Sequence, residues 1–263
     1  MTKKELILKR NTDEARELIR RYSALKAGIL SEFLHCNEDA DIKELKKRYI
    51  DVFGSEELYS DMLTLAQWKN EKKLLPKLSV RHSSVACISG QLPLAAVNAL
   101  TDGDKTVTVI RENDFRSVCE ALAGDSVQFC TLPFCSTLAG FYPTYLRLAR
   151  SYELKICKTA TVQSSDGDEE IKFALFSKKL LAAKDSNTVA FSFIEDTSLD
   201  LSRLSGALHD HSIAVKSTNS RPLEYNMDKF EHTLEASLDS YSLSAFLYFL
   251  EAALPSHNVL GIY

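Results

Sequence analysis

The side chains of this chain that could carry chemistry are cysteines, histidines and scattered basic residues. Cys130, Cys135 and Cys157 could in principle bind zinc, since thiolates are among its preferred ligands. Their spacing fits no zinc finger or ribbon, however, and no histidine lies close by in the sequence. The other cysteines, at positions 36, 87 and 119, form no C-x-x-C motif. We therefore predict reduced, mostly buried thiols and no metal site.

Two histidines flank an acid near a predicted helix end, at His209, Asp210 and His211. Residues two apart do not share a helix face, so these rings are expected to cap the helix and not to bind a metal. The G-x-S-x-G, P-loop, G-x-G-x-x-G and H-E-x-x-H motifs are all absent from the sequence. This excludes the common signatures of hydrolases, nucleotide-binding proteins and zinc proteases. We expect no cofactor.

Composition limits the classes of partner. The 263 residues include 32 Lys and Arg against 36 Asp and Glu, with 45% hydrophobic residues, as in ordinary globular proteins. A mildly acidic chain has no overall electrostatic reason to bind nucleic acid or anionic lipid. The segment MTKKELILKR is charged where a secretory signal needs an apolar stretch, and the apolar segment 243–254 is too short to span a membrane. We expect a cytoplasmic protein.

The elements that must position these residues fall into three regions. Between Asn11 and Lys73 apolar residues recur at helical spacing, which predicts a helical hairpin or a three-helix unit. The charged segment 69–77 reads as a solvated linker. Short β-branched runs at 85–88, 106–110, 127–132, 154–162 and 171–177 follow, with helical stretches at 93–100, 113–122 and 140–151. Alternating strands and helices predict a small α/β lobe.

The last third reads as strand 188–194, helix 199–209, strands 213–220 and 230–238, helix 242–253 and strand 258–263. This βαββαβ order is typical of the ferredoxin-like arrangement, a four-stranded antiparallel sheet with two helices on one face. The sequence thus predicts an α+β multidomain protein with a helical unit at 1–77, an α/β lobe at 78–184 and a ferredoxin-like unit at 185–263.

Two short motifs in this last unit resemble a known family. Ser220-Arg221-Pro222 follows the first helix, and Val259-Leu260-Gly261 lies in the last strand. Together they resemble the E-S-R-P and V-L-G-S-Y motifs of the regulatory ACT domain attached to prephenate dehydratases. The resemblance implies a homodimer formed through this domain.

The family's ACT domains bind phenylalanine with a Gly-Ala-Leu turn and the E-S-R-P strand end. The resemblance thereby assigns a ligand site to Leu199, Asp200, Leu201, Asn219, Ser220 and Arg221. Leu199-Asp200-Leu201 replaces the Gly-Ala-Leu turn, and Asn219 replaces the glutamate. In the alternative, Ser220 to Pro222 simply end a strand and Arg221 pairs with a carboxylate.

The middle region is similar to the dehydratase domain of the same family. The stretch Phe115–Gly140 resembles its "F..V..AL..G" helix and "VPIENS..G" motif, and Glu169–Lys179 stands where the family has its T-R-F strand. At that strand Ile171 replaces the family's catalytic threonine and Lys172 its arginine. Isoleucine can neither donate nor accept a hydrogen bond. The segment that forms the family's second lobe is missing as well, so Thr137 and Lys172 remain as candidate catalytic residues.

The first helical stretch, Glu17–Phe33, resembles the long first helix of the chorismate mutase that many dehydratases carry. Arg20 or Arg21 lies near the arginine that would bind a substrate carboxylate, whereas Glu32 stands where a lysine is expected. Solvated faces of amphipathic helices also explain these basic residues.

The combined expectation is a prephenate dehydratase-like protein of phenylalanine biosynthesis that acts as a non-catalytic amino-acid sensor or partner-binding protein. Its ligand would be an aromatic amino acid or a small molecule resembling prephenate or chorismate. The alternatives are an active chorismate mutase or prephenate dehydratase, and a scaffold whose ACT domain only dimerises.

Overall fold

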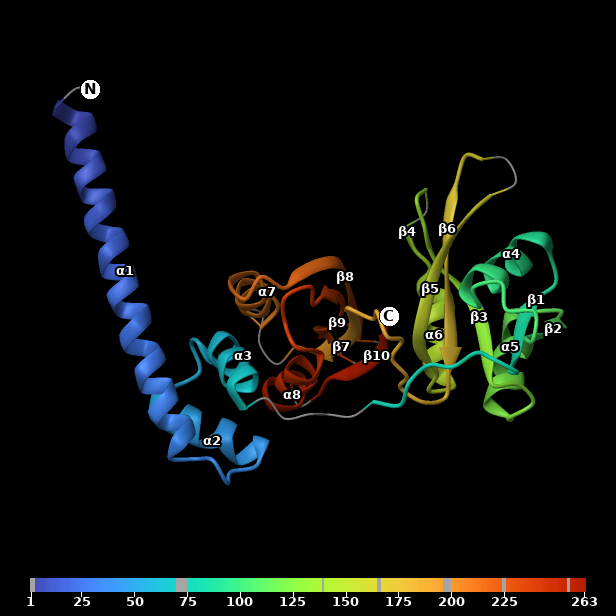
Figure 1. The fold of residues 1–263 in the computed structure, drawn as a ribbon, viewed down its shortest axis with the longest axis horizontal. Coiled ribbons are helices and arrows are strands. Elements are labelled where there is room, and N and C mark those ends of the chain that lie inside the picture. Colours follow the sequence, from blue (N-terminus) through green and yellow to red (C-terminus); the bar gives the residue numbers. More distant parts are fainter. Residues whose placement is uncertain are drawn as a thin grey trace.

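The computed structural model describes residues 3–69, 75–138, 140–164, 167–195, 200–223, 226–254 and 256–263. Its first three elements are helices α1 (Lys3–His35), α2 (Ile42–Phe53) and α3 (Leu58–Lys69). The expected three helices are present, although α1 already begins at Lys3. Gly54 ends α2 with a φ of 81°, a backbone conformation that favours glycine. Figure 1 shows α1 reaching away from the rest of the molecule.

The lobe that follows is built on three parallel strands in the order β2-β1-β3. They are β1 (Ser84–Ile88), β2 (Thr108–Glu112) and β3 (Phe129–Ser136), with helices α4 (Gln91–Leu100) and α5 (Phe115–Ala123) as crossovers. A hairpin of β5 (Lys155–Gln163) and β6 (Glu170–Ser177) completes the lobe, and β6 lies antiparallel to β3. Buried apolar clusters lie around Val118 and Leu122 and around Val97 and Leu100.

The helix expected from residue 140 begins later in the structure. Residues 140 and 141 form the short strand β4 (Gly140–Phe141), which pairs with β3. Helix α6 (Pro143–Ser151) starts at Pro143. Proline suits the first turn of a helix because its missing N–H would have no partner there, so it marks the true start.

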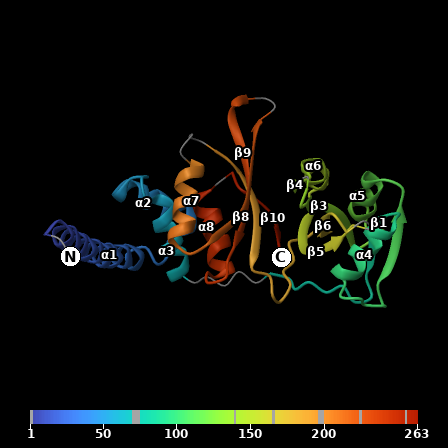
Figure 2. The same ribbon diagram turned by 90° about the horizontal axis from the view of Figure 1, so that it is seen from above.

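The last six elements are β7 (Thr188–Ile194), α7 (Asp200–Asp210), β8 (Ala214–Leu223), β9 (Asn226–Ser237), α8 (Leu243–Ala253) and β10 (Asn258–Ile262). The strands lie in the order β10-β7-β9-β8, and α7 and α8 cover one face (Figure 2). Phe246, Leu247 and Leu250 on α8 are buried. One continuous core joins these helices to α3 through Met62 and Leu65.

One sheet runs through both the lobe and the last unit, which the sequence did not predict. Strand β10 pairs antiparallel with β7 and parallel with β5, where Gly261 lies opposite Ile156. A Cβ atom at Gly261 would lie 2.8 Å from the Cα of Ile156. Only glycine lets the two backbones approach so closely. The predicted mixed α+β fold is confirmed, with the sheet order β2-β1-β3-β6-β5-β10-β7-β9-β8.

Candidate functional site

The face of the C-terminal sheet opposite α7 and α8 is lined with polar side chains that are nevertheless buried. Glu231, Glu235 and Ser237 on β9 share this face with Ser192 on β7, and each is at most 6% exposed. Helix α6 and strand β6 of the lobe lie on this side, because their basic side chains reach the two glutamates. We name this contact the polar interface. We take it as the candidate site because burying a charged group costs free energy unless the group is paired, so each buried glutamate needs a specific partner.

Glu235 is the centre of one half of the polar interface. Its carboxylate accepts hydrogen bonds from Tyr263 and, at 2.6 Å, from the Ser217 hydroxyl. The Nζ atom of Lys172 lies 3.6 Å from the same carboxylate and 5.2 Å from the ring centroids of Phe134 and Tyr263. Burial and the neighbouring Glu235 raise the pKa of the Tyr263 phenol well above its usual range, so this hydroxyl stays protonated and donates.

Glu231 is the centre of the other half. Arg221 on β8 donates to it from Nε at 2.8 Å, and Arg150 on α6 reaches its second oxygen. Burial opposes ionisation of this carboxyl, but the two guanidinium groups hold the pKa of Glu231 below its ordinary value. The glutamate is therefore a bridge between the lobe and the C-terminal sheet. Its pairing with Arg221 is the contact expected from the alternative in which Ser220 to Pro222 simply end a strand and Arg221 pairs with a carboxylate.

A polar cluster of Ser220, His232 and Glu195 lies outside the polar interface, on the opposite face of the sheet. Neighbouring residues of a strand point to opposite sides, so Ser220 and Arg221 face different ways. The Ser220 Oγ lies 2.7 Å from Nδ1 of His232, and Nε2 of His232 lies 2.9 Å from the Glu195 carboxylate. The histidine is 4% exposed, whereas Ser220 is exposed. These contacts orient the exposed Ser220 hydroxyl, which can therefore bind a polar ligand.

The structure separates the residues assigned to the ligand site. Asn219 and Arg221 point toward the polar interface, whereas Ser220 points to the other face. Asp200 and Leu201 begin α7, and both are half-buried. Leu199 lies outside the described residues.

The candidate catalytic positions of the lobe serve other contacts. Thr137 connects the end of β3 to the start of β6, since its N–H donates to the Glu170 carbonyl oxygen at 3.0 Å and its hydroxyl oxygen accepts from the Glu170 N–H at 3.1 Å. Lys172 is engaged with Glu235, and Ile171 packs against an apolar cluster. Cys135 lies opposite Lys172 in the sheet, and burial raises the pKa of its thiol.

The arginines of the first helix lie far from these groups. Arg20 and Arg21 are exposed on α1, and the Arg21 Nε lies 3.1 Å from Glu17 one turn earlier. Helix α1 and strand β6 are on opposite sides of the C-terminal sheet in both views (Figures 1 and 2). The fold therefore does not bring Arg20 or Arg21 together with Lys172.

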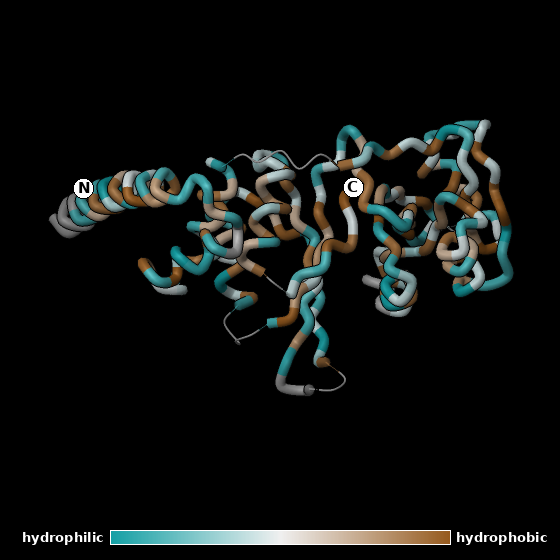
Figure 3. Tube along the Cα trace, turned by 90° about the horizontal axis from the view of Figure 1, so that it is seen from below, coloured by the Kyte–Doolittle hydropathy of each residue, from teal (hydrophilic) through white to brown (hydrophobic). Residues whose placement is uncertain are grey.

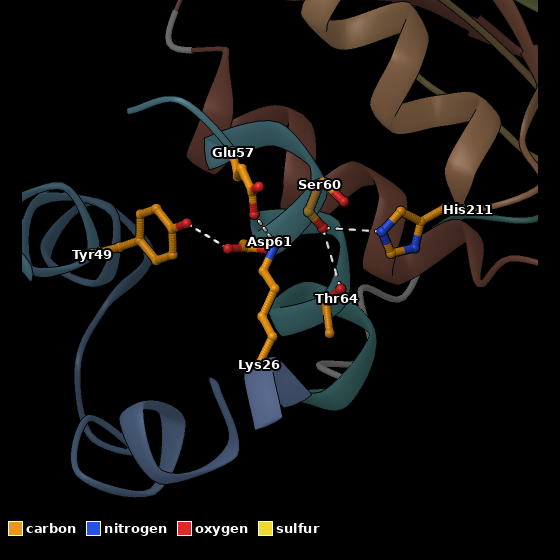
Figure 4. A network of polar contacts seen from close by, with 7 residues as sticks. All are labelled: Lys26, Tyr49, Glu57, Ser60, Asp61, Thr64 and His211. Carbon is orange, nitrogen blue, oxygen red and sulfur yellow. Dashed lines mark hydrogen bonds and ion pairs between the residues drawn. The ribbon is translucent and has the colours of Figure 1, made fainter. Parts of the chain in front are cut away.

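A separate charged network, which the sequence did not predict, connects helices α1, α2 and α3 (Figure 4). Lys26 on α1 contacts Glu57 and Asp61, and the Tyr49 hydroxyl of α2 donates to Asp61 at 2.5 Å. Asp61 is 4% exposed. Burial lowers the pKa of Lys26, but its two carboxylate partners outweigh burial, so the net shift is upward. The local sign of this network in the sequence is the acid Asp61, which stands among apolar residues of α3 between Leu58 and Met62.

His211 contacts a neighbouring helix, and the cysteines form no disulfide bonds. His211 does not cap α7, because its ring lies 3.0 Å from the Ser60 carbonyl oxygen of α3. All six cysteines are free, and burial raises the pKa of Cys157 to about 12. In the part of the chain that the structure describes, no three His, Cys, Asp or Glu side chains are grouped to hold a metal ion. None of the helices described there is long and apolar enough to cross a membrane.

Comparison with known proteins was made by sequence and by structure. No protein-family model matches the chain, and no curated protein matches it by sequence. Solved structures do. The prephenate dehydratase of Streptococcus mutans superposes with a TM-score of 0.55 at 13% identity, over 68% of this chain and 97% of that one. The fold is that of prephenate dehydratases.

Two further structures extend this result. The prephenate dehydratase of Arthrobacter aurescens, solved in complex with L-Phe, gives a TM-score of 0.52 at 12% identity and covers 68% of this chain and 89% of that one. GqqA, described as a novel type of quorum quenching acylase, gives 0.55 at 16% identity over 68% and 94%. A shared prephenate dehydratase fold therefore accommodates more than one described activity, so the site must decide the function.

Proposed function

We propose that this chain is a non-catalytic relative of prephenate dehydratases that senses an aromatic amino acid in the phenylalanine pathway through an ACT-like C-terminal unit. The observation that carries the proposal is the pairing of Lys172 with Glu235. Lys172 stands at the position of the arginine in the family's T-R-F strand, and the carboxylate of Glu235 already pairs with its charge. A substrate carboxylate would have to displace Glu235, whose other partners are Ser217 and Tyr263.

The missing acid function supports the same conclusion. Dehydration of prephenate needs a group that protonates or stabilises the leaving hydroxyl. Ile171 stands where the family has its threonine, and its side chain has no polar atom. The hairpin of β5 and β6 spans the interval in which the family has its second lobe. Without that lobe no interlobe cleft excludes water from a substrate.

The proposed ligand site lies at the β8 end with the exposed Ser220 hydroxyl. An amino acid brings an ammonium group and a carboxylate, which need an acceptor and a donor. The cluster of Ser220, His232 and Glu195 contains both kinds of group, with Ser220 2.7 Å from one ring nitrogen of His232 and Glu195 2.9 Å from the other. The L-Phe complex of the Arthrobacter aurescens enzyme supports an aromatic amino acid as the first ligand to test.

The experiment is a thermal-shift titration of the full chain with L-Phe, L-Tyr, L-Trp, prephenate and chorismate. A ligand that binds only the native state at 100 times its Kd stabilises it by about 2.7 kcal/mol. We expect this shift with an aromatic amino acid, and its loss in Ser220→Ala but not in Ser202→Ala, an exposed serine of α7. Consumption of prephenate by the wild-type chain that disappears in Lys172→Met would refute the non-catalytic assignment. Consumption of chorismate that disappears in an Arg20→Ala, Arg21→Ala variant would favour the mutase instead.

A further inference from the structure

Ser220, His232 and Glu195 are joined in the order hydroxyl, imidazole and carboxylate. The Ser220 Oγ lies 2.7 Å from Nδ1 of His232, and Nε2 of the same ring lies 2.9 Å from the Glu195 carboxylate. A carboxylate accepts hydrogen bonds and does not donate them, so in the neutral ring Nε2 carries the proton. Nδ1 is then the acceptor, and the Ser220 hydroxyl donates to it. A hydroxyl bonded to a base that a carboxylate orients is the arrangement of nucleophilic serines.

The imidazole is buried and the hydroxyl is exposed, as nucleophilic catalysis requires. His232 is 4% exposed, and the centroid of its ring lies 5.2 Å from that of Phe193 and 6.4 Å from that of Phe230. These contacts hold the ring in its orientation toward Ser220. Ser220 itself is exposed on β8, in a hairpin with β9 that projects from the rest of the molecule (Figures 2 and 3). A substrate can therefore reach the hydroxyl from solvent.

The main chain of β8 offers a donor for an oxygen on which negative charge develops. Among the described strands β8 has a partner on one side only, because it is the last in the order of the sheet. Pro222 has no N–H, and a proline within an edge strand stands where the missing N–H would face the free edge. Residues two apart in an antiparallel strand direct their N–H groups to the same side, so the Ser220 N–H also faces the free edge. This N–H can donate to an oxyanion formed at its own side chain.

An apolar surface adjoins the hydroxyl. Pro222 and Phe230 lie opposite each other in the hairpin, two residue pairs beyond Ser220 and His232 and on the same face of the sheet. Both are exposed, Phe230 at 37%. Apolar side chains favour an uncharged, apolar group of a substrate. The surroundings of Ser220 therefore fit a carboxylic ester with a small apolar acyl group.

We propose that Ser220 is an acyl-transfer nucleophile and that this chain hydrolyses esters of small apolar carboxylic acids. The Ser220 Oγ bonds to the carbonyl carbon, its proton passes to Nδ1 of His232, and the electron pair of the C=O bond moves onto the oxygen. The bond to the alcohol oxygen then breaks, and the alcohol leaves with the proton from Nδ1. Water attacks the acyl-serine, gives its proton to the same nitrogen, and releases the acid and Ser220. Glu195 is a positioning residue that acts through His232.

This activity goes beyond the proposed sensing, in which the chain catalyses neither the dehydration of prephenate nor the mutase reaction. The two roles share the Ser220 hydroxyl and differ at His232, because only acyl transfer needs a base. The thermal shift with L-Phe tests sensing by itself. A chain that shifts with L-Phe but does not react with esters loses only the acyl transfer, and the reverse result removes only the sensing.

The first test is covalent labelling of the full chain with a fluorophosphonate, which phosphonylates activated serines and expels fluoride. We expect one label per chain, located at Ser220 by mass spectrometry of peptides. Ser220→Ala should abolish labelling, and His232→Gln should slow it by about 100-fold or more. The matched control is Thr218→Ala, which removes an exposed hydroxyl from the same face of β8 and should label at the wild-type rate. An unlabelled wild type, a label on another residue, or an unchanged rate in His232→Gln overturns the proposal.

The second test is the release of p-nitrophenol from p-nitrophenyl acetate. Glu195→Gln keeps the size of the side chain but allows an amide N–H to donate to Nε2, which leaves the ring proton on Nδ1 and deprives Ser220 of its acceptor. We expect kcat to fall by at least about tenfold while KM is unchanged. Circular dichroism and thermal unfolding check that the variant folds as the wild type does. An unchanged kcat in Glu195→Gln, or an equal fall in Thr218→Ala, overturns the proposal.

Discussion

Helix α1 and the polar interface reverse the usual distribution of side chains in opposite ways. The helix exposes Leu18 and Leu25 at 66% each, whereas the sheet face buries Glu231 and Glu235 at 5% and 6% exposure. The buried acids have their partners within the chain, from Arg150, Arg221, Lys172 and Tyr263. Leu18 and Leu25 have no comparable cover among the residues that the structure describes. The two regions therefore differ in outcome, since the chain pairs its buried acids internally and leaves the apolar side chains of α1 exposed to solvent.

The two charged clusters connect different parts of the chain. The network of Lys26, Asp61 and Tyr49 joins three helices, and burial with the Asp61 hydrogen bond raises the pKa of Tyr49 far above its ordinary value. The polar interface instead joins the lobe to the C-terminal sheet, because Arg150 and Lys172 of the lobe reach Glu231 and Glu235. Both clusters stabilise the fold only while every member keeps its partner.

The greatest loss of stability is expected in the charged network that joins the three helices. Asp61→Ala removes one carboxylate of Lys26 and the acceptor of the buried Tyr49 hydroxyl. Breaking a buried pair in this way costs about 3–5 kcal/mol in the free energy of unfolding. Urea denaturation measures it. Glu17→Ala, which removes only the exposed partner of Arg21, should change stability by less than about 0.5 kcal/mol. Equal effects of the two variants would contradict the structural role of the network.

A smaller effect is expected at the junction of the lobe and the C-terminal sheet. Gly261→Ala forces a Cβ atom against the backbone of Ile156 and should destabilise by about 1–3 kcal/mol. Gly206→Ala on α7 is the control, since a Cβ atom there meets nothing within 4 Å. Alanine inside a helix is favoured over glycine by about 0.5–1 kcal/mol. Thermal unfolding of both variants should therefore shift in opposite directions, and a harmless Gly261→Ala would argue against the β5 and β10 pairing.

The ion pairs of Glu231 should give a modest dependence of stability on pH. The pKa of Glu231 is lower in the folded state, so its ion pairs stabilise the protein fully above the ordinary value of 4.5. That contribution is lost as the pH falls through the lower folded pKa. Glu231→Gln should lower stability by about 1 kcal/mol at pH 7 and flatten its decline on acidification. Parallel stability curves of variant and wild type between pH 7 and 3 would contradict this account.

Local patterns in the sequence predicted most of the secondary structure, because each element carries its own periodicity. Strand 188–194 agrees to the residue, and the βαββαβ order is present. Local patterns do not indicate which distant segments contact each other, so those contacts could not be predicted. Pairing of Gly261 with Ile156 joins residues 105 positions apart, and neither segment signals the other.

The site was harder to predict than the elements for the same reason. Ser220, Arg221, Thr137 and Lys172 were named from motifs, but their partners His232, Glu231, Glu170 and Glu235 come from other strands. A motif fixes the residue types along one strand. The register between strands decides which charge meets which, and a shift of one residue would move each side chain to the other face.

The place of β10 in the sheet has a consequence for biosynthesis. It lies between β5 and β7, yet it follows every other described strand along the chain. A ribosome therefore releases β5 and β7 long before the strand that fits between them. Until β10 emerges, both present open edges to the crowded cell, and exposed edges invite pairing with other chains. The open edges of β5 and β7 are therefore where mispairing during translation is expected.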